Sequence, residues 1–552
     1  MPAIVQVNVT QTVAPTPITL QSTGALISQG ATNLTPGRAT LLTQLSDLTP
    51  FLNGALALTS ITQTAGLATA TAPAAHGYTI GDTLLVTIAG ANQANYNGTF
   101  LVTVTTAYAF TFSVPSGTAT PATGTLVYTD ADVAELLAMA TTYFAQGSQT
   151  AVRVLELGPG NANDGVAFLT AWIVANPNGI AYSATFFGYY AYLVPREWDG
   201  NASFLAMLAT FESPSAKTYF YITTTLATYT LYTPLMKCAL TMIEAPVQGA
   251  YPANAFTALS YSAGYATATT TTAHGVAVGT WFQVSGVTPA GYNGYWLAAA
   301  GTTGSTLVWA IATNPGAETA LGTLVASYYA STGIAANEFS LASAFNVALS
   351  WNPSGGFVPP LGYSFLYGVT AFPQRGNNAI LTTLANANVN VVGTGAEGGI
   401  SNTILLNGNT MDGNSFNYWY AVDWANVTLN LNISNAVING SNNSESPLYL
   451  NQAGINTLQA VAASTMATGV TAGLVLGTIV QTELTSQVFA QNLADGDYEG
   501  QCVVNAVPFS AYYAAFPGNY KARLYGGYSV SFTPQLGFEN IIINLNATTF
   551  VG

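Results

Sequence analysis

The sequence predicts a multidomain protein of mixed α+β and α/β class, with an α/β core, two small inserted antiparallel β-domains and a strand arm at each end. Three observations predict it. A Thr- and Val-rich segment occurs twice, helix-like and strand-like patterns alternate around the two copies, and both chain ends alternate apolar with polar residues. With 552 residues, half of them hydrophobic, the chain is long enough for three or four domains.

Charge is scarce in this chain. It has 22 acidic and 8 basic residues, so 30 of 552 residues are charged, against about 25% in ordinary domains. The aromatic content of 12% excludes a disordered acidic chain. Eight basic residues at a net charge of −14 exclude a cationic track along nucleic acid, so we expect no direct nucleic acid partner. A surface of uncharged polar residues suits a chain that is buried in an assembly.

Nothing in the sequence predicts disulfides, secretion or membrane insertion. Cys238 and Cys502 lie far apart in sequence, and the first basic residue is Arg38, so the cationic start of a signal peptide is missing. The longest apolar candidate, residues 223–245, is interrupted by a proline and a lysine. We expect a soluble chain without stable membrane insertion.

One segment is duplicated. Both copies contain a Gly-x-Ala-Thr-Ala-Thr run, His-Gly, Tyr-Asn-Gly and a closing Gly-Thr-Leu-Val. These landmarks are His76-Gly77, Tyr96-Asn97-Gly98 and residues 124–127 in the first copy, and His274-Gly275, Tyr292-Asn293-Gly294 and residues 322–325 in the second. Asn-Gly turns between short Thr-, Val- and aromatic-rich runs are typical of hairpins. Each copy is therefore predicted to be a small antiparallel β-domain.

The repeats hold both histidines of the chain, His76 and His274. Either could be a ligand or a base, but each occupies the same place in its copy, with no cysteine and few carboxylates nearby. A turn histidine whose ring bonds the backbone of a loop is favoured. With these histidines set aside, no Ser–His–Asp or Cys–His arrangement remains.

The segment between the copies has the alternation typical of an α/β layer. Asp130-Ala-Asp132 predicts a helix start, and apolar spacing predicts helices and strands after it. The expected helices are 133–144, 164–175 and 203–211, and the expected strands are 151–157, 191–194, 218–223 and 238–244. Beyond residue 329 we predict a helix at 338–349, a Pro- and Gly-rich stretch at 352–362, a helix at 378–385 and a strand at 388–392.

Three stretches alternate apolar and polar residues: 5–10, 427–433 and 541–547. Strands at chain ends need a sheet edge, either in their own domain or in a neighbouring subunit by strand addition. The expected inter-subunit arms are carried by Val5, Val7 and Val9 and by Ile541, Ile543 and Leu545, and the expected receiving strand contains Val427, Leu429, Leu431 and Ile433.

Few residues are candidates for chemistry. A G-x-G-x-x-G run at 393–398 precedes a strand-like rather than a helix-like segment, which disfavours a dinucleotide site. Glu197 and Asp199 flank a tryptophan and could suggest acid/base chemistry on a sugar, but an ion-paired loop is favoured. The aromatic run at 418–424 is expected to be core rather than a sugar platform. We expect no enzyme activity, and no catalytic, cofactor-binding or metal-binding residue.

The C-terminal half carries a resemblance to a known family. Residues 391–443 contain GTGAEGGISNTILLNGNT and YWYAVDWANVTLNLNISNAVINGSNN, followed by a predicted helix at 451–466 and a closing PQLGFENIIINLNATTFV. Together with YAYLVPREWD at 190–199 and KTYFYITTT at 217–225, these runs resemble the tail sheath proteins of contractile bacteriophages (myoviruses), in a branch catalogued as a phage and prophage family of unknown function. The resemblance covers residues 1–61, 129–262 and 329–552, and leaves the two β-repeats as decorations.

The resemblance implies a structural subunit of a virion tail, assembled in the host cytoplasm. Such subunits form hexameric rings stacked helically around a tail tube, share terminal arms with their neighbours, and contract to drive the tube through the host envelope for genome ejection. The implied partners are further copies, the tail tube protein, and the baseplate and tail terminator or neck proteins. Since no motor site is present, contraction would release stored conformational free energy, with hinges near residues 10–17 and 534–537.

The resulting division of the chain has seven parts. They are an N-terminal strand arm (1–24), the start of the sheath core (25–61), the first β-repeat domain (62–128), an α/β sheath domain (129–262), the second β-repeat domain (263–328), a tube-facing assembly core (329–535) and a C-terminal strand arm (536–552). Two other functions stay open. A cell-surface or tail-associated adhesin or carbohydrate-binding protein fits the β-repeats and aromatics, and a polysaccharide-degrading enzyme would need a carboxylate pair that the sequence does not offer.

Overall fold

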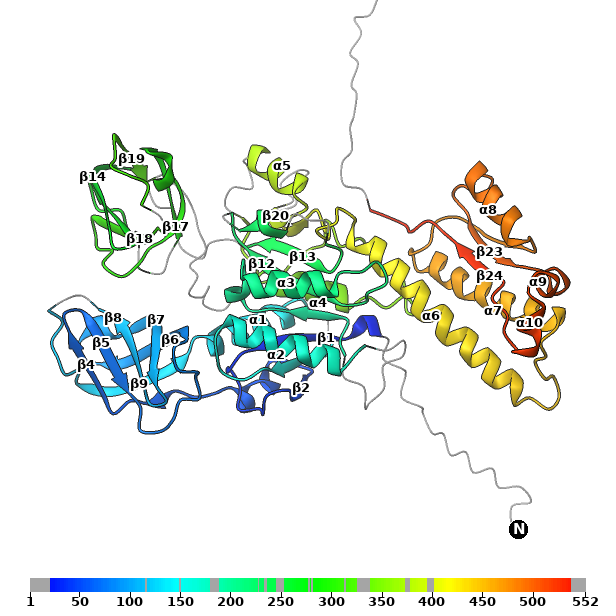
Figure 1. The fold of residues 1–552 in the computed structure, drawn as a ribbon, viewed down its shortest axis with the longest axis horizontal. Coiled ribbons are helices and arrows are strands. Elements are labelled where there is room, and N and C mark those ends of the chain that lie inside the picture. Colours follow the sequence, from blue (N-terminus) through cyan, green and yellow to red (C-terminus); the bar gives the residue numbers. More distant parts are fainter. Residues whose placement is uncertain are drawn as a thin grey trace, which may run out of the picture.

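An eight-stranded sheet forms the centre of the computed structural model, with the strand order β2-β10-β1-β11-β12-β13-β20-β21 (Figure 1). The strands are β1 (Gly24–Ser28), β2 (Ala39–Leu42), β10 (Val152–Glu156), β11 (Ala191–Leu193), β12 (Tyr219–Thr224), β13 (Ala239–Ile243), β20 (Asn390–Thr394) and β21 (Thr403–Leu406). The six inner strands run parallel and the two edge strands antiparallel. Every residue of β1, β12 and β13 is buried, as expected for parallel strands covered on both faces.

The structure describes residues 20–114, 117–147, 150–178, 188–226, 228–232, 236–244, 253–276, 278, 281–311, 314–324, 338–372, 378–394 and 402–537.

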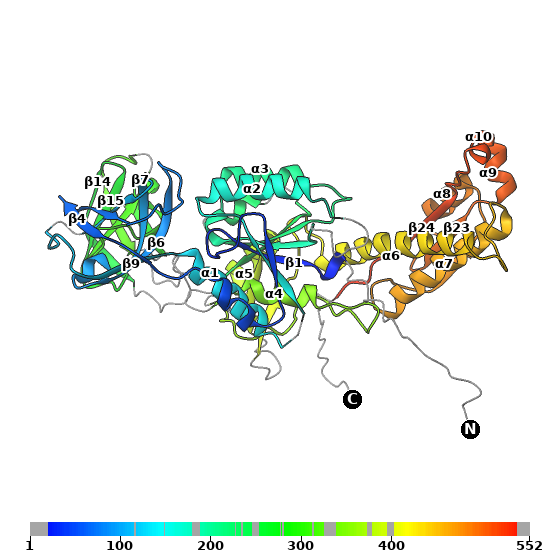
Figure 2. The same ribbon diagram turned by 90° about the horizontal axis from the view of Figure 1, so that it is seen from below.

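Helices cover both faces of this sheet. α1 (Asp132–Phe144) and α4 (Leu341–Leu349) pack on one face, and α2 (Ala162–Ala175) and α3 (Ala202–Phe211) on the other (Figure 2). α5 (Asn378–Asn386) contributes to the same hydrophobic cluster as α2 and α3. Asn161 and Asn201 start α2 and α3 by accepting backbone N–H bonds, which explains why these helices begin there. The predicted α/β layer is therefore confirmed at the level of its helices and strands.

The start of α1 differs in detail from the prediction. Asp130 is the last residue of a strand, the residue at the cap position is Ala131, and that residue makes no side-chain capping bond. The Asp130 carboxylate instead accepts the backbone N–H of Asp132 at 3.1 Å, so it still satisfies one free donor at the helix start.

Residues 56–130, here called the first β-unit, form a seven-stranded antiparallel sheet with its own hydrophobic cluster. Its strands are β3 (Leu56–Ala57), β4 (Ser60–Thr64), β5 (Leu67–Thr71), β6 (Thr83–Ala91), β7 (Gly98–Thr106), β8 (Ala109–Ser113) and β9 (Gly124–Asp130). The second β-unit, residues 254–324, is a six-stranded antiparallel sheet with a separate cluster. Its strands are β14 (Asn254–Ser262), β15 (Tyr265–Thr270), β16 (Trp281–Thr288), β17 (Gly294–Leu297), β18 (Thr306–Ala310) and β19 (Ala320–Leu324).

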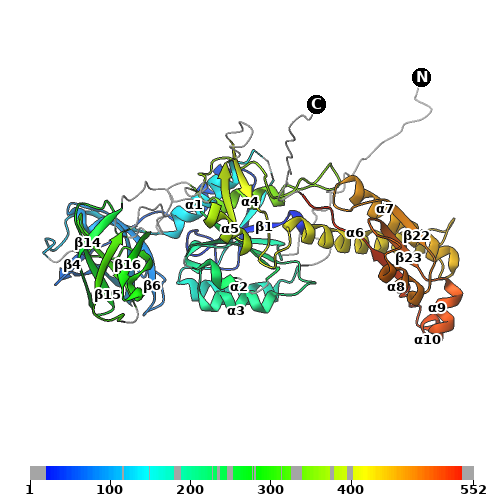
Figure 3. The ribbon, with the colours of Figure 1, turned by 90° about the horizontal axis from the view of Figure 1, so that it is seen from above.

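The two β-units repeat each other's hydrogen bonds as well as their sequence. The Asn97 side chain accepts from the N–H of Ala91 and donates to its carbonyl, and Asn293 makes the same two bonds to Val287. These bonds hold the turn that the Tyr-Asn-Gly landmark predicts. Figures 1 and 3 place both β-units at the same end of the molecule.

The opposite end is a C-terminal lobe, residues 416–537, which α6 joins to the central sheet (Figure 1). The lobe contains α6 (Phe416–Ser441), α7 (Gln452–Thr471), α8 (Ser486–Asp495), α9 (Phe509–Ala515), α10 (Pro517–Lys521) and the strands β22 (Ile479–Thr482), β23 (Cys502–Ala506) and β24 (Tyr528–Ser531). At 26 residues, α6 is about 39 Å long. No helix in the described ranges has the length and apolarity needed to cross a bilayer.

Candidate functional site

The expected receiving strand is a helix. Val427, Leu429, Leu431 and Ile433 all lie in α6, so the prediction of a strand there was wrong. The alternation suggested a strand, but residues four positions apart lie on the same face in a helix as well as in a strand. The pairs 427/431 and 429/433 therefore fit a helix equally well. Val427 is buried, and Leu429 and Ile433 pack against the main hydrophobic cluster. An expected outward position, Asn432, donates instead to the hydroxyl of Thr465 on α7.

The expected arm residues fall outside the described part of the chain. Val5, Val7 and Val9 precede residue 20, and Ile541, Ile543 and Leu545 follow residue 537. Their role as strand arms therefore stays a prediction.

The C-terminal lobe does contain a sheet with open edges. β23 lies between β22, which runs parallel to it, and β24, which runs antiparallel. In the described residues neither β22 nor β24 has a strand partner on its outer side. α7 braces one end of the sheet, because the Gln459 amide donates to the carbonyls of Thr482 and Val504. Three residues after β24, Pro534 bridges to Val475, and the chain then runs toward its C-terminal end.

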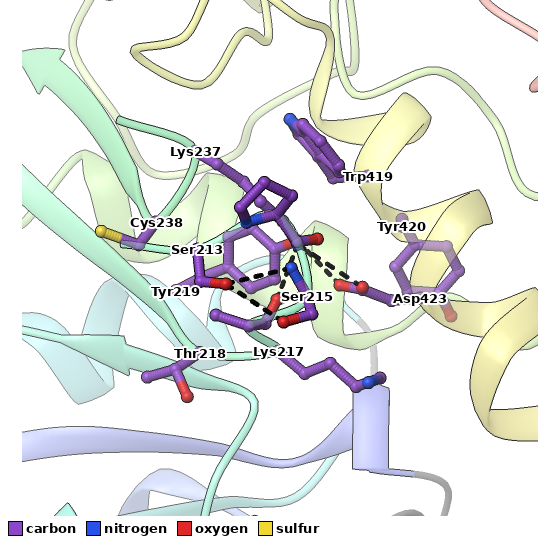
Figure 4. Close-up of polar contacts among 12 residues, drawn as sticks. Ser213, Ser215, Lys217, Thr218, Tyr219, Lys237, Cys238, Trp419, Tyr420 and Asp423 are labelled. Carbon is purple, nitrogen blue, oxygen red and sulfur yellow. Dashed lines mark hydrogen bonds and ion pairs between the residues drawn. The ribbon is translucent and has the colours of Figure 1, made fainter. Parts of the chain in front are cut away.

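A buried ion pair joins α6 to the central sheet (Figure 4). Lys237 Nζ lies 3.6 Å from Asp423 Oδ1, and each side chain is only 3% exposed. The same ammonium donates to the carbonyls of Pro214 at 3.0 Å and Ala216 at 2.6 Å. Lys237 precedes β13, and Asp423 lies in the first two turns of α6. The pair therefore holds the start of the helix against the N-terminal end of an inner strand of the sheet.

Aromatic residues complete this cluster. The second carboxylate oxygen of Asp423 accepts the hydroxyls of Tyr190 at 3.0 Å and Tyr219 at 2.7 Å. The ring of Trp419 lies 4.4 Å from Lys237 Nζ, within the range of a cation–π contact. Burial lowers the pKa of Lys237 and raises the pKa of Asp423, while their mutual attraction opposes both changes. A buried pair with these bonds holds two elements in one geometry, and loss of either partner leaves a buried charge.

A second buried cluster surrounds Arg196. Its guanidinium bonds Glu244 at 2.6 Å, lies 3.7 Å from Glu135, donates to the carbonyl of Glu338 at 2.9 Å and covers the ring of Phe339 at 4.2 Å. Arg196 thereby connects three parts of the core: the residue that follows β13, helix α1 and the segment before α4.

Carboxylates outnumber cations around this arginine. Burial, together with Glu135 and Asp130 nearby, raises the pKa of Glu197 to about 8. Burial also raises the pKa of Asp130 to about 7 and moves the pKa of Asp132 well above its ordinary value. Glu197 Oε1 is buried and has no hydrogen-bond partner in the described structure. These groups hold protons near neutral pH because ionising them together in a dry site is costly.

The two carboxylates considered for acid/base chemistry, Glu197 and Asp199, have separate surroundings. Asp199 accepts the hydroxyls of Thr228 and Tyr232 at 2.5 and 2.9 Å and therefore has different partners from Glu197. The loop is ion-paired through Arg196, as expected. Tyr420 and Trp424 of the aromatic run are buried in the main cluster, so its assignment to the core is confirmed.

Both histidines hold turns. The backbone N–H groups of Tyr78 and Val276 donate to Nδ1 of His76 and His274, and His76 Nε2 bonds the carbonyl of Thr106 at 2.9 Å. The prediction of turn histidines is confirmed.

The remaining motifs offer no reactive arrangement. After the Gly-rich run the next described element is β21, paired antiparallel to β20. The thiols of Cys238 and Cys502 are free and buried. Among the described residues no group of three His, Cys, Asp or Glu side chains could hold a metal ion.

The Lys237–Asp423 contact was not predicted from the sequence. The signal available was local context, since Lys237 interrupts an apolar stretch and Asp423 interrupts an aromatic one. In a chain with so few charges, a charged residue inside an apolar run is a strong indication of a buried pair. The sequence carries no indication of which distant residue is its partner.

These features define a class: a large mixed α/β protein with several sheets and with buried ion pairs inside its core. No protein-family model and no curated protein sequence matches the chain. Among solved structures, the crystal structure of a sheath tail protein from Listeria innocua superposes with a TM-score of 0.35 and 7% sequence identity, covering 82% of this chain and 85% of that chain. A superposition this loose does not establish a common fold.

Proposed function

We propose that the chain is the structural subunit of a contractile phage tail sheath, and not an enzyme. The observation that carries the proposal is the three-stranded sheet of the C-terminal lobe, whose outer strands have no strand partner on their outer sides among the described residues. Its last strand, β24, ends at Ser531, and the alternating segment at 541–547 begins ten residues later in the sequence. Strand addition between copies needs two things: a sheet edge without a partner and a segment with the alternating pattern of a strand.

The resemblance of residues 391–443 to tail sheath proteins supports the same function. The lobe sheet takes the receiving role that the sequence assigned to residues 427–433, because α6 cannot accept a strand. In the assembly, copies would form hexameric rings stacked around the tail tube, with baseplate and neck proteins at the two ends of the virion tail.

The buried pairs suit this work. When subunits turn during contraction, the lobe has to follow the core as one body if the arms are to stay paired. The Lys237–Asp423 pair fixes α6 to the sheet, so rotation is transmitted along a helix about 39 Å long. Movement would then concentrate in the chain segments between copies, and stored conformational free energy would drive contraction and genome ejection.

Negative-stain electron microscopy of the purified chain tests the proposal. Hollow tubes or stacked six-fold rings are expected. Deleting residues 1–12 or 540–552 should leave folded subunits that form no tubes, with circular dichroism as the folding control. Monodisperse single particles at high concentration would reject the sheath and favour the adhesin.

A matched pair of variants tests the C-terminal arm more finely. Replacing Ile541, Ile543 and Leu545 together by Asn should abolish tubes, because these residues form one face of the expected strand. Replacing Asn544 and Asn546 by Thr changes the other face and should leave tubes intact. Normal tubes from the first variant would contradict the arm hypothesis.

A further inference from the structure

The C-terminal lobe has a basic, aromatic edge on its outer helices. Lys521 ends α10 and Arg523 follows it, and both are exposed. The third exposed basic residue of the described ranges, Arg38, lies outside the lobe, directly before β2 of the central sheet. Two large hydrophobic side chains flank the pair, since Tyr520 is 55% and Leu524 is 54% exposed.

The basic edge lies at the capped end of α10. Arg523 has a φ of 56°, the left-handed conformation in which helices commonly end, and the N–H of Leu524 closes the cap by donating to the carbonyl of Asn519 at 2.9 Å. Neither Lys521 nor Arg523 forms an ion pair with another described residue. Tyrosine and arginine are enriched at protein interfaces relative to the rest of the surface, and this edge exposes both Tyr520 and Arg523.

An acidic edge occurs in the same lobe, at the end of α8. Asp495 is the last residue of this helix, and Asp497 and Glu499 follow the left-handed Gly496. All three carboxylates are exposed, and none of them forms an ion pair in the described structure. Negative charge at a helix C-terminus opposes the helix dipole, so this edge too is stabilised by an external cation.

The two edges have opposite charge. Asp495, Asp497 and Glu499 place three acids within five residues, and Lys521 and Arg523 place two bases within three, in a chain with only 30 charged residues among 552. The helices that carry the two edges, α8 and α10, both lie in the lobe at the end of the molecule opposite the β-units (Figure 2). No described ion pair joins them within one chain, which leaves each available to another molecule.

We propose that the partner is a second copy of this chain. The basic edge of one lobe (Phe516, Tyr520, Lys521, Arg523 and Leu524) docks head-to-tail on the acidic edge of the next (Asp495, Asp497 and Glu499). Such a heterologous contact closes into a ring or continues as a helix. The inference deepens the proposed function, because it names a lobe contact between sheath subunits that is separate from the terminal arms.

Charge reversal gives a reciprocal test. The first variant carries Lys521→Glu and Arg523→Glu, and the second carries Asp495→Lys and Glu499→Lys. Each variant alone presents like charges on both edges, so its self-association, measured by sedimentation velocity, should weaken by about tenfold or more. An equal mixture of the two restores opposite charges at every contact and should associate as the wild type does. Arg38→Glu reverses an exposed charge outside the lobe and should change nothing.

The outcomes separate this contact from the proposed function. If the first variant associates like the wild type, the basic edge faces another partner and the inference is wrong. If both variants lose association and their mixture does not regain it, charge complementarity is refuted. Wild-type chains that associate through these edges without making tubes would support the contact and reject the sheath. A wild type that stays monomeric at every concentration would reject both.

Discussion

Replacing Asp423 by alanine removes the carboxylate that faces Lys237 inside the joint between α6 and the sheet. Lys237 would keep its bonds to two backbone carbonyls and its contact with Trp419, but it would lose its counter-ion. Tyr190 and Tyr219 would lose the oxygen to which both donate. The joint would therefore contain an uncompensated cation and two hydroxyls without their acceptor.

The structure sets the size of the effect. Breaking a buried pair by removing one partner costs about 3–5 kcal/mol. The destabilisation caused by the unpaired charge has an upper limit, because Lys237 can lose its proton and become neutral. From an ordinary pKa of 10.5, deprotonation at pH 7 costs about 5 kcal/mol, at about 1.4 kcal/mol per pKa unit. We expect the Asp423→Ala variant to lose about 3–5 kcal/mol in the free energy of unfolding of the core.

The pH dependence distinguishes an unpaired charge from a simple cavity. In the variant, the pKa of Lys237 is lower in the folded than in the unfolded chain, so the folded state binds fewer protons above that lowered pKa. Its stability relative to the wild type should then rise with pH between 7 and about 10, by up to about 1.4 kcal/mol per pH unit. A cavity alone would give a deficit that does not change with pH.

Urea unfolding of dilute chain, followed by tryptophan fluorescence at several pH values, measures both quantities. Glu445→Ala, an exposed acidic change just beyond α6, is the control and should stay within about 0.5 kcal/mol of the wild type. The double variant Lys237→Met, Asp423→Asn removes both charges and keeps an acceptor for the tyrosines, so it should lose less than Asp423→Ala does. A loss below about 1 kcal/mol for Asp423→Ala would refute the assigned role of the pair.

Three further predictions concern other parts of the molecule. Glu197 keeps its proton up to a folded-state pKa of about 8, whereas the unfolded carboxyl ionises near pH 4.5. Its contribution to the stability of the core should therefore be greatest below about pH 4.5 and fall as the pH rises to about 8, and Glu197→Gln should remove this part of the decline in urea titrations. Burial raises the pKa of Cys502 to about 11 and that of Cys238 further, so a thiol reagent at pH 8 should label neither cysteine in native chain and both in urea. Gly90→Ala should destabilise the first β-unit by about 2 kcal/mol or more in thermal unfolding, because a Cβ there would meet backbone at 1.8 Å, whereas Gly117→Ala, with a similar positive φ and open space, should lose only about 1 kcal/mol.

Each of these has an opposing result. A Glu197→Gln variant whose pH profile matches the wild type would place the titrating proton elsewhere. Rapid labelling of native Cys238 would show that the packing of α3 against the start of β13 opens in solution. Equal losses for Gly90→Ala and Gly117→Ala would mean that backbone conformation, and not crowding, decides the effect.

The parts that sequence predicted well are those with a local cause. Strand β10 and helix α3 match the expected ranges closely, because an apolar run or apolar face ends at a polar cap or turn. Helix α6 was missed because Asn alternating with apolar residues satisfies two periods at once. The central strand β1 was missed as well, since the three apolar residues between Gly24 and Ser28 are too short a run to indicate the type of element.

The candidate site was harder to predict than the fold. The Lys237–Asp423 and Arg196–Glu244 contacts connect residues far apart in sequence, and no spacing rule joins them. The lobe sheet is built from three short strands separated by helices, so its open edges become visible only once the strands are paired. The arm residues Val5 to Val9 and Ile541 to Leu545 stay predictions from alternation.

Each β-unit begins and ends on neighbouring strands. Leu56 of β3 pairs with Tyr128 of β9, and Asn254 of β14 pairs with Leu324 of β19, so the paired residues at the two ends of each unit lie roughly 5 Å apart. A cassette with this geometry can be cut out and its ends rejoined by a short linker without pulling on the central sheet. It can equally be exchanged for an unrelated domain whose termini are adjacent. The positions of the two β-units are therefore suitable sites for inserting foreign domains.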